Sequence, residues 1–201
     1  MKFSKKDLVF SIATGFITGV IAWRILVFLE IGTAYSSFLP YLVIIVPLLW
    51  IFGVNLGYFL GNYINFFNQF GRFAAVGFTN AAVDFGILNL LISSSGVSEG
   101  SLYSVFKGGS FLIATLHSYF WNKFWVFEAG QNKGAVEFGK FIGVSVGAVL
   151  VNVLAASAVV GLIDPAFGLS KEVWANVGAI VGSGTALIFS FLGFRILVFK
   201  R

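Results

Sequence analysis

The sequence predicts an all-α integral membrane protein with six transmembrane helices, and three observations support this fold class. Hydrophobic residues make up 58% of the 201 residues, charged residues make up only 10%, and 25 residues are Phe. A chain of this composition could not cover a water-exposed surface with polar groups, so the lipid bilayer is its solvent. The apolar residues also form runs of about 20, the length that a helix needs to cross a bilayer. Transmembrane β-strands would instead show alternating segments of about ten residues.

The first apolar run, near residues 8–29, is expected to form a retained transmembrane helix. Three lysines precede it, as in a signal peptide, but the run is too long for a signal peptide and no small-residue cleavage site ends it. Arg24 lies in its distal part, where a long side chain can reach the outer membrane interface near Glu30. We therefore expect the lysines on the cytoplasmic side and Arg24 close to the opposite interface.

The second run, near residues 38–61, carries Gly53, Gly57 and Gly61 at four-residue spacing. This spacing places the glycines on one face of a helix, where another helix can approach closely. The packing partner is either another helix of this chain or a second copy, and the small size of the core favours a homodimer. Residues 62–69 then form a short connector at the membrane interface.

The rest of the chain contains four apolar runs that form two related halves. The motif FGRF at 70–73 returns as FGKF at 138–141, and the ending KFWVF at 123–127 returns as RILVF at 195–199. Each half crosses the membrane twice, so both halves enter from the cytoplasm and the two repeats are parallel. The four runs lie near residues 73–92, 102–127, 141–163 and 173–199.

These repeats divide the chain near residue 69. We expect an N-terminal transmembrane helix pair with its interfacial connector over residues 1–69, and a four-helix core over residues 70–201. The loop 128–137 between the two halves is too short to hold a soluble domain. The boundary therefore lies within one membrane-embedded body.

Basic residues mark the cytoplasmic side of a membrane protein, and here they gather at one set of helix ends. Arg72 and Lys123 belong to this set together with both termini, whereas Lys171 lies at the opposite ends with four acids. Both termini are therefore expected in the cytoplasm. The net charge of +5 is an orientation signal. We expect no binding of nucleic acid, which would need the basic residues on one water-facing surface.

Metal and enzyme chemistry are not expected. The chain contains no Cys and a single His, so it has neither a disulfide framework nor the ligands for a metal cluster. No acid pair, no nucleophile with a base and no phosphate loop occurs in a water-accessible segment. The sequence therefore predicts neither an enzyme nor a cofactor.

Polar residues inside the core are the candidates for a binding site. Asn80 and Asp84 lie four residues apart and share one face of the first core helix. In the next helix, Lys107 and Ser110 begin a narrow polar stripe. A turn centred near residues 95–96 places Asp84 and Lys107 almost equally far from it along antiparallel helices. The two charges can therefore meet at a similar depth.

The stripe continues toward the end of the same helix with Ser118 and then Trp121 or Asn122, and His117 borders it. In the second half, the position that matches Asp84 in the repeat is Asn152, and the reflection through the second turn reaches Ser183. The second half thus keeps polar residues and lacks the charges. We expect an asymmetric substrate-binding site centred on the first half.

Two interpretations of the buried charges remain open. Each charge costs roughly 2.5 to 3.5 kcal/mol to insert near a helix centre, so Asp84 and Lys107 are the leading candidates for a functional site. A mutual ion pair that only fixes helix packing is the structural alternative. For the other polar candidates, hydrogen bonding between helices is an equal alternative to ligand contact. Trp121 and Trp125 are interpreted as interfacial anchors.

Taken together, three motifs resemble those of the GtrA-like membrane protein family, over about residues 70–201. The resemblance implies a four-helix fold akin to that of small multidrug transporters, with the first two helices as an addition. The motifs are FAAVG at 73–77 with Asn80 and Asp84, NKFWVF at 122–127, and the second ending at 195–199.

The resemblance also implies a function. Members of the GtrA-like family move polyprenyl-phosphate-linked sugars across the bacterial inner membrane, or anchor enzymes that make or use them. We therefore expect a flippase that serves the synthesis of cell-surface polysaccharide or glycan, with membrane lipids and a glycosyltransferase as further partners. A scaffold for a polyprenyl-phosphate glycosyltransferase is one alternative. The other is a proton-coupled efflux protein that uses Asp84, although the nearby Lys107 favours an anion over an organic cation.

Overall fold

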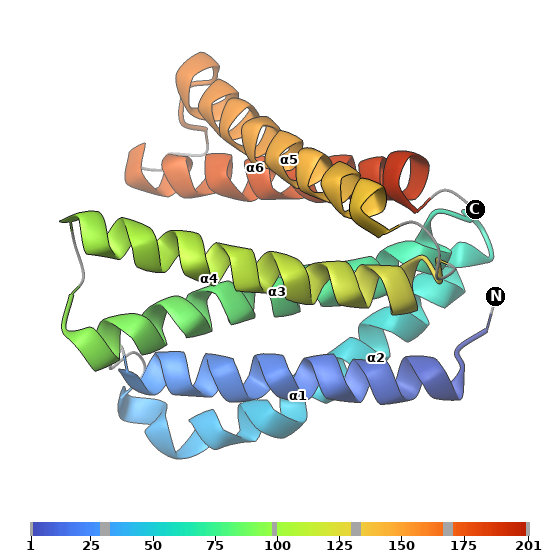
Figure 1. Ribbon diagram of the computed structural model, residues 1–201, viewed down its shortest axis with the longest axis horizontal. Coiled ribbons are helices and arrows are strands. Elements are labelled where there is room, and N and C mark those ends of the chain that lie inside the picture. Colours follow the sequence, from blue (N-terminus) through green and yellow to red (C-terminus); the bar gives the residue numbers. More distant parts are fainter. Residues whose placement is uncertain (1, 29–32, 98–99, 130–133, 167–170, 200–201) are drawn as a thin grey trace. The chain divides into compact units, whose positions relative to one another are not determined.

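The computed structural model describes residues 2–28, 33–97, 100–129, 134–166 and 171–199. Within these ranges the chain is helical and has no strand, which confirms the all-α prediction (Figure 1). The helices are α1 (Lys5–Phe28), η1 (Thr33–Tyr41), α2 (Leu42–Gly61), α3 (Phe67–Ser95), α4 (Gly100–Trp121), η2 (Asn122–Val126), α5 (Gly134–Leu162), α6 (Lys171–Gly193) and η3 (Phe194–Val198).

Four of these helical segments are long and apolar enough to cross a membrane. The chain is therefore a multi-pass membrane protein, and the expected number of six crossings stays a prediction. The boundaries differ from those expected in two places. Helix α3 already begins at Phe67, within the predicted connector 62–69, and α5 already begins at Gly134, within the predicted loop 128–137. The four segments are Lys5–Phe28, Ser36–Gly61, Phe67–Ser95 and Gly134–Asn152.

The chain folds as two compact units, Met1–Glu128 and Ala129–Arg201. The first unit contains α1 to α4 and η2, and the second contains the hairpin of α5 and α6 with η3. The division that we expected near residue 69 describes a repeat in the sequence and stays a prediction. The predicted turn at 95–96 is confirmed, because Gly96 ends α3 with a φ of 72° and donates its N–H to Ile92 O at 2.8 Å.

Helices α1 and α3 run parallel, with contacts at regular intervals of two helical turns. Arg72 Nη1 lies 3.8 Å from Asp7 Oδ1, and two turns later Thr79 Oγ1 lies 3.5 Å from Thr14 O. The numbering offset between the partners is the same in both contacts (72 − 7 and 79 − 14). A constant offset means that the two helices advance together in the same direction.

The third contact of this register joins Ile21 and Gly86. A Cβ added at Gly86 would lie 2.6 Å from Ile21 Cγ2, so only glycine fits against this side chain without movement. A heptad period keeps one stripe of each helix facing the other, as in a coiled coil. The register that begins at the charged pair therefore extends along most of α1.

Thr79 connects three helices of the first unit. Its hydroxyl donates to Ala75 O at 2.8 Å, and it lies 3.0 Å from Thr18 Oγ1 in α1 and 3.3 Å from Trp50 Nε1 in α2. The side chain is fully buried. Interhelical hydrogen bonds of this kind hold helices together where lipid provides no hydrophobic driving force.

The glycines of α2 pack within the chain. A Cβ added at Gly57 would lie 3.0 Å from Phe67 O and 3.1 Å from Gly71 Cα, and Gly61 lies against the side chain of Asn68. Gly53, in contrast, has no neighbour within 4 Å of its Cβ position. The close-packing function predicted for this face is thus fulfilled between α2 and α3. Because Gly57 packs against α3 of the same chain, it does not support the predicted homodimer, which stays a proposal.

The two repeats end in the same unusual way, with one turn of π-helix. Phe127 N–H donates to Asn122 O at 2.9 Å, and Phe199 N–H donates to Phe194 O at 2.8 Å. These residues correspond at the offset that the two endings have in the sequence (194 − 122 and 199 − 127). The structure therefore confirms that the two endings are equivalent in backbone as well as in sequence.

Candidate functional site

One predicted contact joins the two helices of the first repeat. Ser110 Oγ in α4 donates a hydrogen bond of 2.6 Å to Asp84 Oδ1 in α3. Ser110 is fully buried and Asp84 is half-buried. Asp84 lies about three helical turns after Arg72, or about 18 Å along the helix. The carboxylate is therefore far from the helix end at which α3 begins.

Asn80 lies one helical turn before Asp84 and is half-buried. Its Oδ1 is buried and has no hydrogen-bond partner within the described residues. An unpaired buried amide is costly, so this position favours a ligand or a water as its partner. Asn80, Asp84 and Ser110 together form a small polar region between α3 and α4, which we call the hairpin site.

The other predicted site residues are not brought into the hairpin site by any described contact. The side chains of Lys107 and Ser183 lie outside the described part of the structure, so the predicted pairing of Asp84 with Lys107 stays a prediction. Asn152 is half-buried in α5, in the second unit.

His117 and Asn122 bond within their own helix. Trp121 Nε1 donates to His117 Nε2 at 2.7 Å, and Asn122 Nδ2 donates to Ser118 O at 2.8 Å. Asn122 is buried with 1% of its surface exposed. Among the described residues, His117 Nδ1 and Asn122 Oδ1 have no hydrogen-bond partner. These contacts fix the end of α4, and neither residue has a described contact with Asp84.

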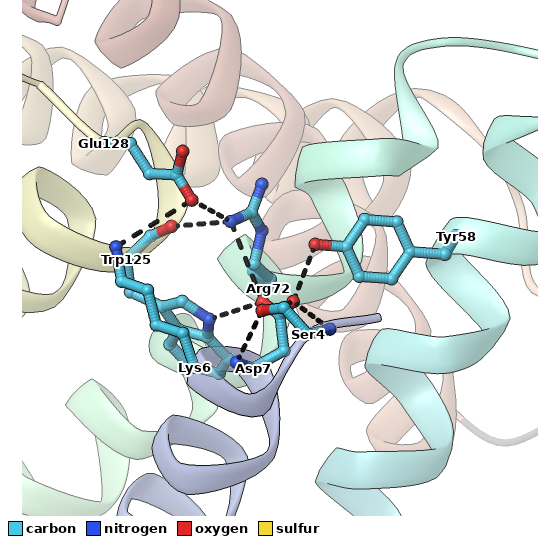
Figure 2. Close-up of polar contacts among 7 residues, drawn as sticks. All are labelled: Ser4, Lys6, Asp7, Tyr58, Arg72, Trp125 and Glu128. Atoms are coloured by element: carbon cyan, nitrogen blue, oxygen red, sulfur yellow. Dashed lines mark hydrogen bonds and ion pairs between the residues drawn. The ribbon is translucent and has the colours of Figure 1, made fainter. Parts of the chain in front are cut away.

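A second polar region, which the sequence did not predict, lies where α1 and α3 begin (Figure 2). It is centred on Asp7 and Arg72, each with 2% of its surface exposed. Their closest charged atoms are 3.8 Å apart. We call this region, whose other members are Ser4, Lys6, Tyr58, Trp125 and Glu128, the charged cluster.

Asp7 receives hydrogen bonds from three sides. Ser4 donates through its backbone N–H at 2.9 Å and its hydroxyl at 2.7 Å, Tyr58 donates from α2 at 3.1 Å, and Trp125 Nε1 donates from η2 at 3.0 Å. Asp7 N–H in turn donates to Ser4 Oγ at 3.2 Å, which completes a capping box at the start of α1. The carboxylate thus connects α1, α2 and η2.

Arg72 connects α3 to the π-helical ending. Its Nη1 donates to Trp125 O at 2.8 Å and lies 3.0 Å from Glu128 Oε1 (Figure 2). Lys6 approaches the same Glu128 oxygen at 3.8 Å. Within the described residues, Nε and Nη2 of Arg72 have no hydrogen-bond partner. The guanidinium is therefore positioned mainly by one nitrogen.

The charged cluster changes how several residues are interpreted. Arg72 and Lys123, which we read as cations marking the cytoplasmic end, are buried with 2% and 8% of their surfaces exposed. Trp125, predicted as an interfacial anchor, is fully buried and binds Asp7, so that prediction is wrong. The missed signal is the spacing of Ser4 and Asp7, which matches a capping box in the printed sequence.

The two regions differ in chemistry. The hairpin site offers a carboxylate and an amide oxygen that can accept hydrogen bonds from hydroxyl groups. The charged cluster has its central carboxylate bonded to three surrounding residues, so it stabilises helix packing. In the described part of the chain, no group of His, Asp and Glu residues could hold a metal ion.

The comparison with known protein families gives a match over most of the chain. The family model described as GtrA/DPMS, transmembrane domain, covers residues 72–199. The match begins at Arg72 and ends at Phe199, and it includes both helical hairpins and both π-helical endings. It leaves out α1 and α2. No curated protein and no solved structure matches the chain.

Proposed function

The chain belongs to the GtrA/DPMS transmembrane-domain family, and we propose that it flips a polyprenyl-phosphate-linked sugar across the bacterial inner membrane. This family comprises membrane proteins linked to the translocation of lipid-linked sugars. The product would serve the synthesis of a cell-surface polysaccharide or glycan. Membership supports the substrate class, and the identity of the sugar is not part of the proposal.

The observation that carries the proposal is the hydrogen bond between Asp84 and Ser110, 2.6 Å long, inside the family domain. A carboxylate far from the helix ends is costly in a bilayer and usually marks a substrate pathway. Asn80 adds a buried amide oxygen without a described partner on the same helix. We infer that these acceptors bind sugar hydroxyls as the headgroup crosses.

The phosphate needs a cation, and Lys107 is the residue that we assign to it. Position 107 lies one helical turn before Ser110 on α4, so the two positions are neighbours on one helix face. The proposed lysine would bind the phosphate while Asp84 and Asn80 turn toward the sugar. The prenyl chain would remain in the bilayer, so the protein would need no closed aqueous pore.

The orientation of the chain is part of the same proposal. The cationic ends of the helices support cytoplasmic termini. The substrate would then enter the hairpin site from the cytoplasmic leaflet.

A scaffold for a glycosyltransferase is the second candidate function. It is favoured by the charged cluster, in which two hydrogen bonds to Asp7, from Tyr58 in α2 and Trp125 in η2, connect α1 to other helices. A scaffold needs a rigid bundle and no substrate path, so the flipping rate would not depend on the hairpin site.

Reconstitution separates the two functions. The purified full chain is placed in proteoliposomes with a panel of polyprenyl-phosphate-linked sugars, and headgroup movement between leaflets is measured. We expect Asp84→Asn to slow flipping roughly tenfold, which corresponds to about 1.4 kcal/mol of lost stabilisation, and Ser110→Ala to slow it less. Thr115→Val is the matched control, because Thr115 is buried in the same helix and its described bond is to Phe111 O. Equal rates for Asp84→Asn and the parent protein would contradict the proposal.

A further inference from the structure

A groove opens between α1 and α3 beyond the contact of Ile21 with Gly86. Its volume is about 350 Å³. Apolar side chains such as Val20, Ile25 and Leu90 form most of its wall. Three polar residues, Arg24, Asn89 and Ser93, also line it. The groove therefore combines a space suited to a hydrocarbon chain with a cation and neutral polar groups.

The register of the two helices fixes the depth of these residues. Arg24 follows Asp7 along α1 by the same interval as Asn89 follows Arg72 along α3 (24 − 7 and 89 − 72). Because Asp7 and Arg72 are paired, Arg24 and Asn89 lie at one level, about 25 Å along the helices from the charged cluster. The hydrocarbon core of a bilayer is about 30 Å thick. The guanidinium is thus close to the opposite interface, where lipid phosphates lie.

Within the described part of the chain, Arg24 carries an uncompensated charge. It is exposed, and no hydrogen bond or ion pair joins it to another described residue. Glu30, which the sequence places near the same interface, lies outside the described residues, and no acidic residue lines the groove. Asn89 Nδ2 donates to Phe85 O and Ser93 Oγ donates to Leu90 O, so neither supplies a counter-charge. The groove lining is therefore cationic, and an anionic headgroup would balance it.

We propose that this groove binds an anionic glycerophospholipid, with one acyl chain between α1 and α3 and the phosphate on Arg24. The guanidinium offers a fork of donors that matches phosphate geometry. A zwitterionic lipid brings an additional cation, for which the groove lining has no acidic partner. The site depends on α1, which lies outside the family domain, so it is separate from the hairpin site and does not require the proposed flipping activity.

A second groove provides an internal comparison. It lies between α2 and α3, has a volume of about 280 Å³ and is lined by residues such as Gly53, Phe70 and Phe78, none of them charged. It can hold a hydrocarbon chain but has no group that distinguishes headgroups. Of these two grooves, only the one at Arg24 is expected to select lipid by charge.

Native mass spectrometry of the purified full chain, titrated with phosphatidylglycerol or phosphatidylcholine, tests the proposal. We expect preferential retention of phosphatidylglycerol, and roughly tenfold weaker retention in Arg24→Gln, as for the loss of one charge-assisted hydrogen bond. Arg24→Lys should keep most of the preference. Val20→Trp, which fills the groove, should lower phosphatidylglycerol binding while Arg24 is intact. The control Gly53→Leu fills the second groove and should leave the preference unchanged.

Four results would overturn the proposal. Arg24→Gln could retain phosphatidylglycerol as well as the parent protein does, or the parent could bind both lipids equally. Millimolar inorganic phosphate could displace the lipid, which would reduce the site to a simple anion contact. Stronger binding of polyprenyl phosphate than of phosphatidylglycerol would assign the groove to the carrier lipid instead.

Discussion

Loss of the negative charge at Asp7 should destabilise the first unit more than any other single carboxylate replacement in the described chain. In Asp7→Asn, the buried guanidinium of Arg72 loses one of its two described acidic neighbours. The new amide also places a donor among Ser4, Tyr58 and Trp125, all of which donate to the carboxylate. Both effects oppose the folded state, in which these groups are fixed close together.

The structure sets the size of the effect. Removing one partner of a buried ion pair costs about 3 to 5 kcal/mol. Glu128 remains 3.0 Å from Arg72 and is partly exposed, so it compensates part of the charge and places the expected loss at the lower end, about 3 kcal/mol. Replacing both members, as in Asp7→Leu with Arg72→Met, should recover only the part of this loss that comes from the uncompensated guanidinium. The donors of Tyr58 and Trp125 would remain without their acceptor.

Equilibrium unfolding in detergent micelles measures these differences as free energies. Asp164→Asn is the control, because Asp164 is an exposed carboxylate and its replacement should change stability by less than about 0.5 kcal/mol. The reasoning would be refuted if Asp7→Asn were as stable as this control. It would also be refuted if the loss in free energy of unfolding of the double variant equalled the sum of the losses of the two single variants. Residues that interact directly should instead show a coupling energy of about 0.5 to 3 kcal/mol.

Three further predictions concern packing and topology. Gly15→Ala should cost about 1 to 3 kcal/mol in the same unfolding assay, because its new Cβ would lie 2.5 Å from the backbone of Pro47. The control Gly53→Ala meets no neighbour and should be nearly neutral. Similar stabilities of the two variants would contradict the close contact of α1 with α2 at Gly15. Thr79→Val should cost about 1 to 3 kcal/mol, because it removes an acceptor shared between helices and leaves the half-buried Trp50 Nε1 without its partner. A change below about 0.5 kcal/mol would exclude this connecting role. In whole cells, a unique Cys at Gln131 should resist a membrane-impermeant reagent while one at Ser94 reacts, and labelling at Gln131 would reverse the proposed topology.

The helices could be predicted because the length of an apolar run is a direct consequence of bilayer thickness. The π-helical endings were recognised only as a sequence repeat, since KFWVF and RILVF carry no local sign of a wider helical turn. The early start of α3 was also missed, because residues 62–69 carry no local sign of a helix start. Phe66 stacks on Phe70 at a centroid distance of 4.8 Å, so aromatic contacts extend the helix into a segment that resembled an interfacial connector.

The hairpin site was partly predictable. The matched distances of Asp84 and Lys107 from the turn at Gly96 correctly brought α3 and α4 together, and Ser110 of α4 is a described partner of Asp84. The pairing of Asp84 with Lys107 itself stays a prediction. The sequence could not give the rotation of each helix about its axis. That rotation decides which member of a polar stripe lies opposite a given carboxylate.

The charged cluster could not be found by counting charges. Asp7 and Arg72 are far apart in the sequence, and their pairing depends on the parallel register of α1 and α3. In the sequence, Arg72 has the same position as any cation that marks a cytoplasmic helix end. The capping-box spacing of Ser4 and Asp7 predicts where α1 begins, but it does not predict that the carboxylate also binds Trp125.

The role of the charges in flipping is tested most directly by the double variant Asp84→Leu with Lys107→Leu. Replacing a buried ion pair by apolar residues is often neutral for folding, so this variant separates a structural role from a role in transport. The flipping rate of a polyprenyl-phosphate-linked sugar is measured in proteoliposomes that contain equal amounts of folded protein. We predict a folded protein whose rate is at least about tenfold below that of the parent chain. Flipping by the double variant at the parental rate would contradict the account.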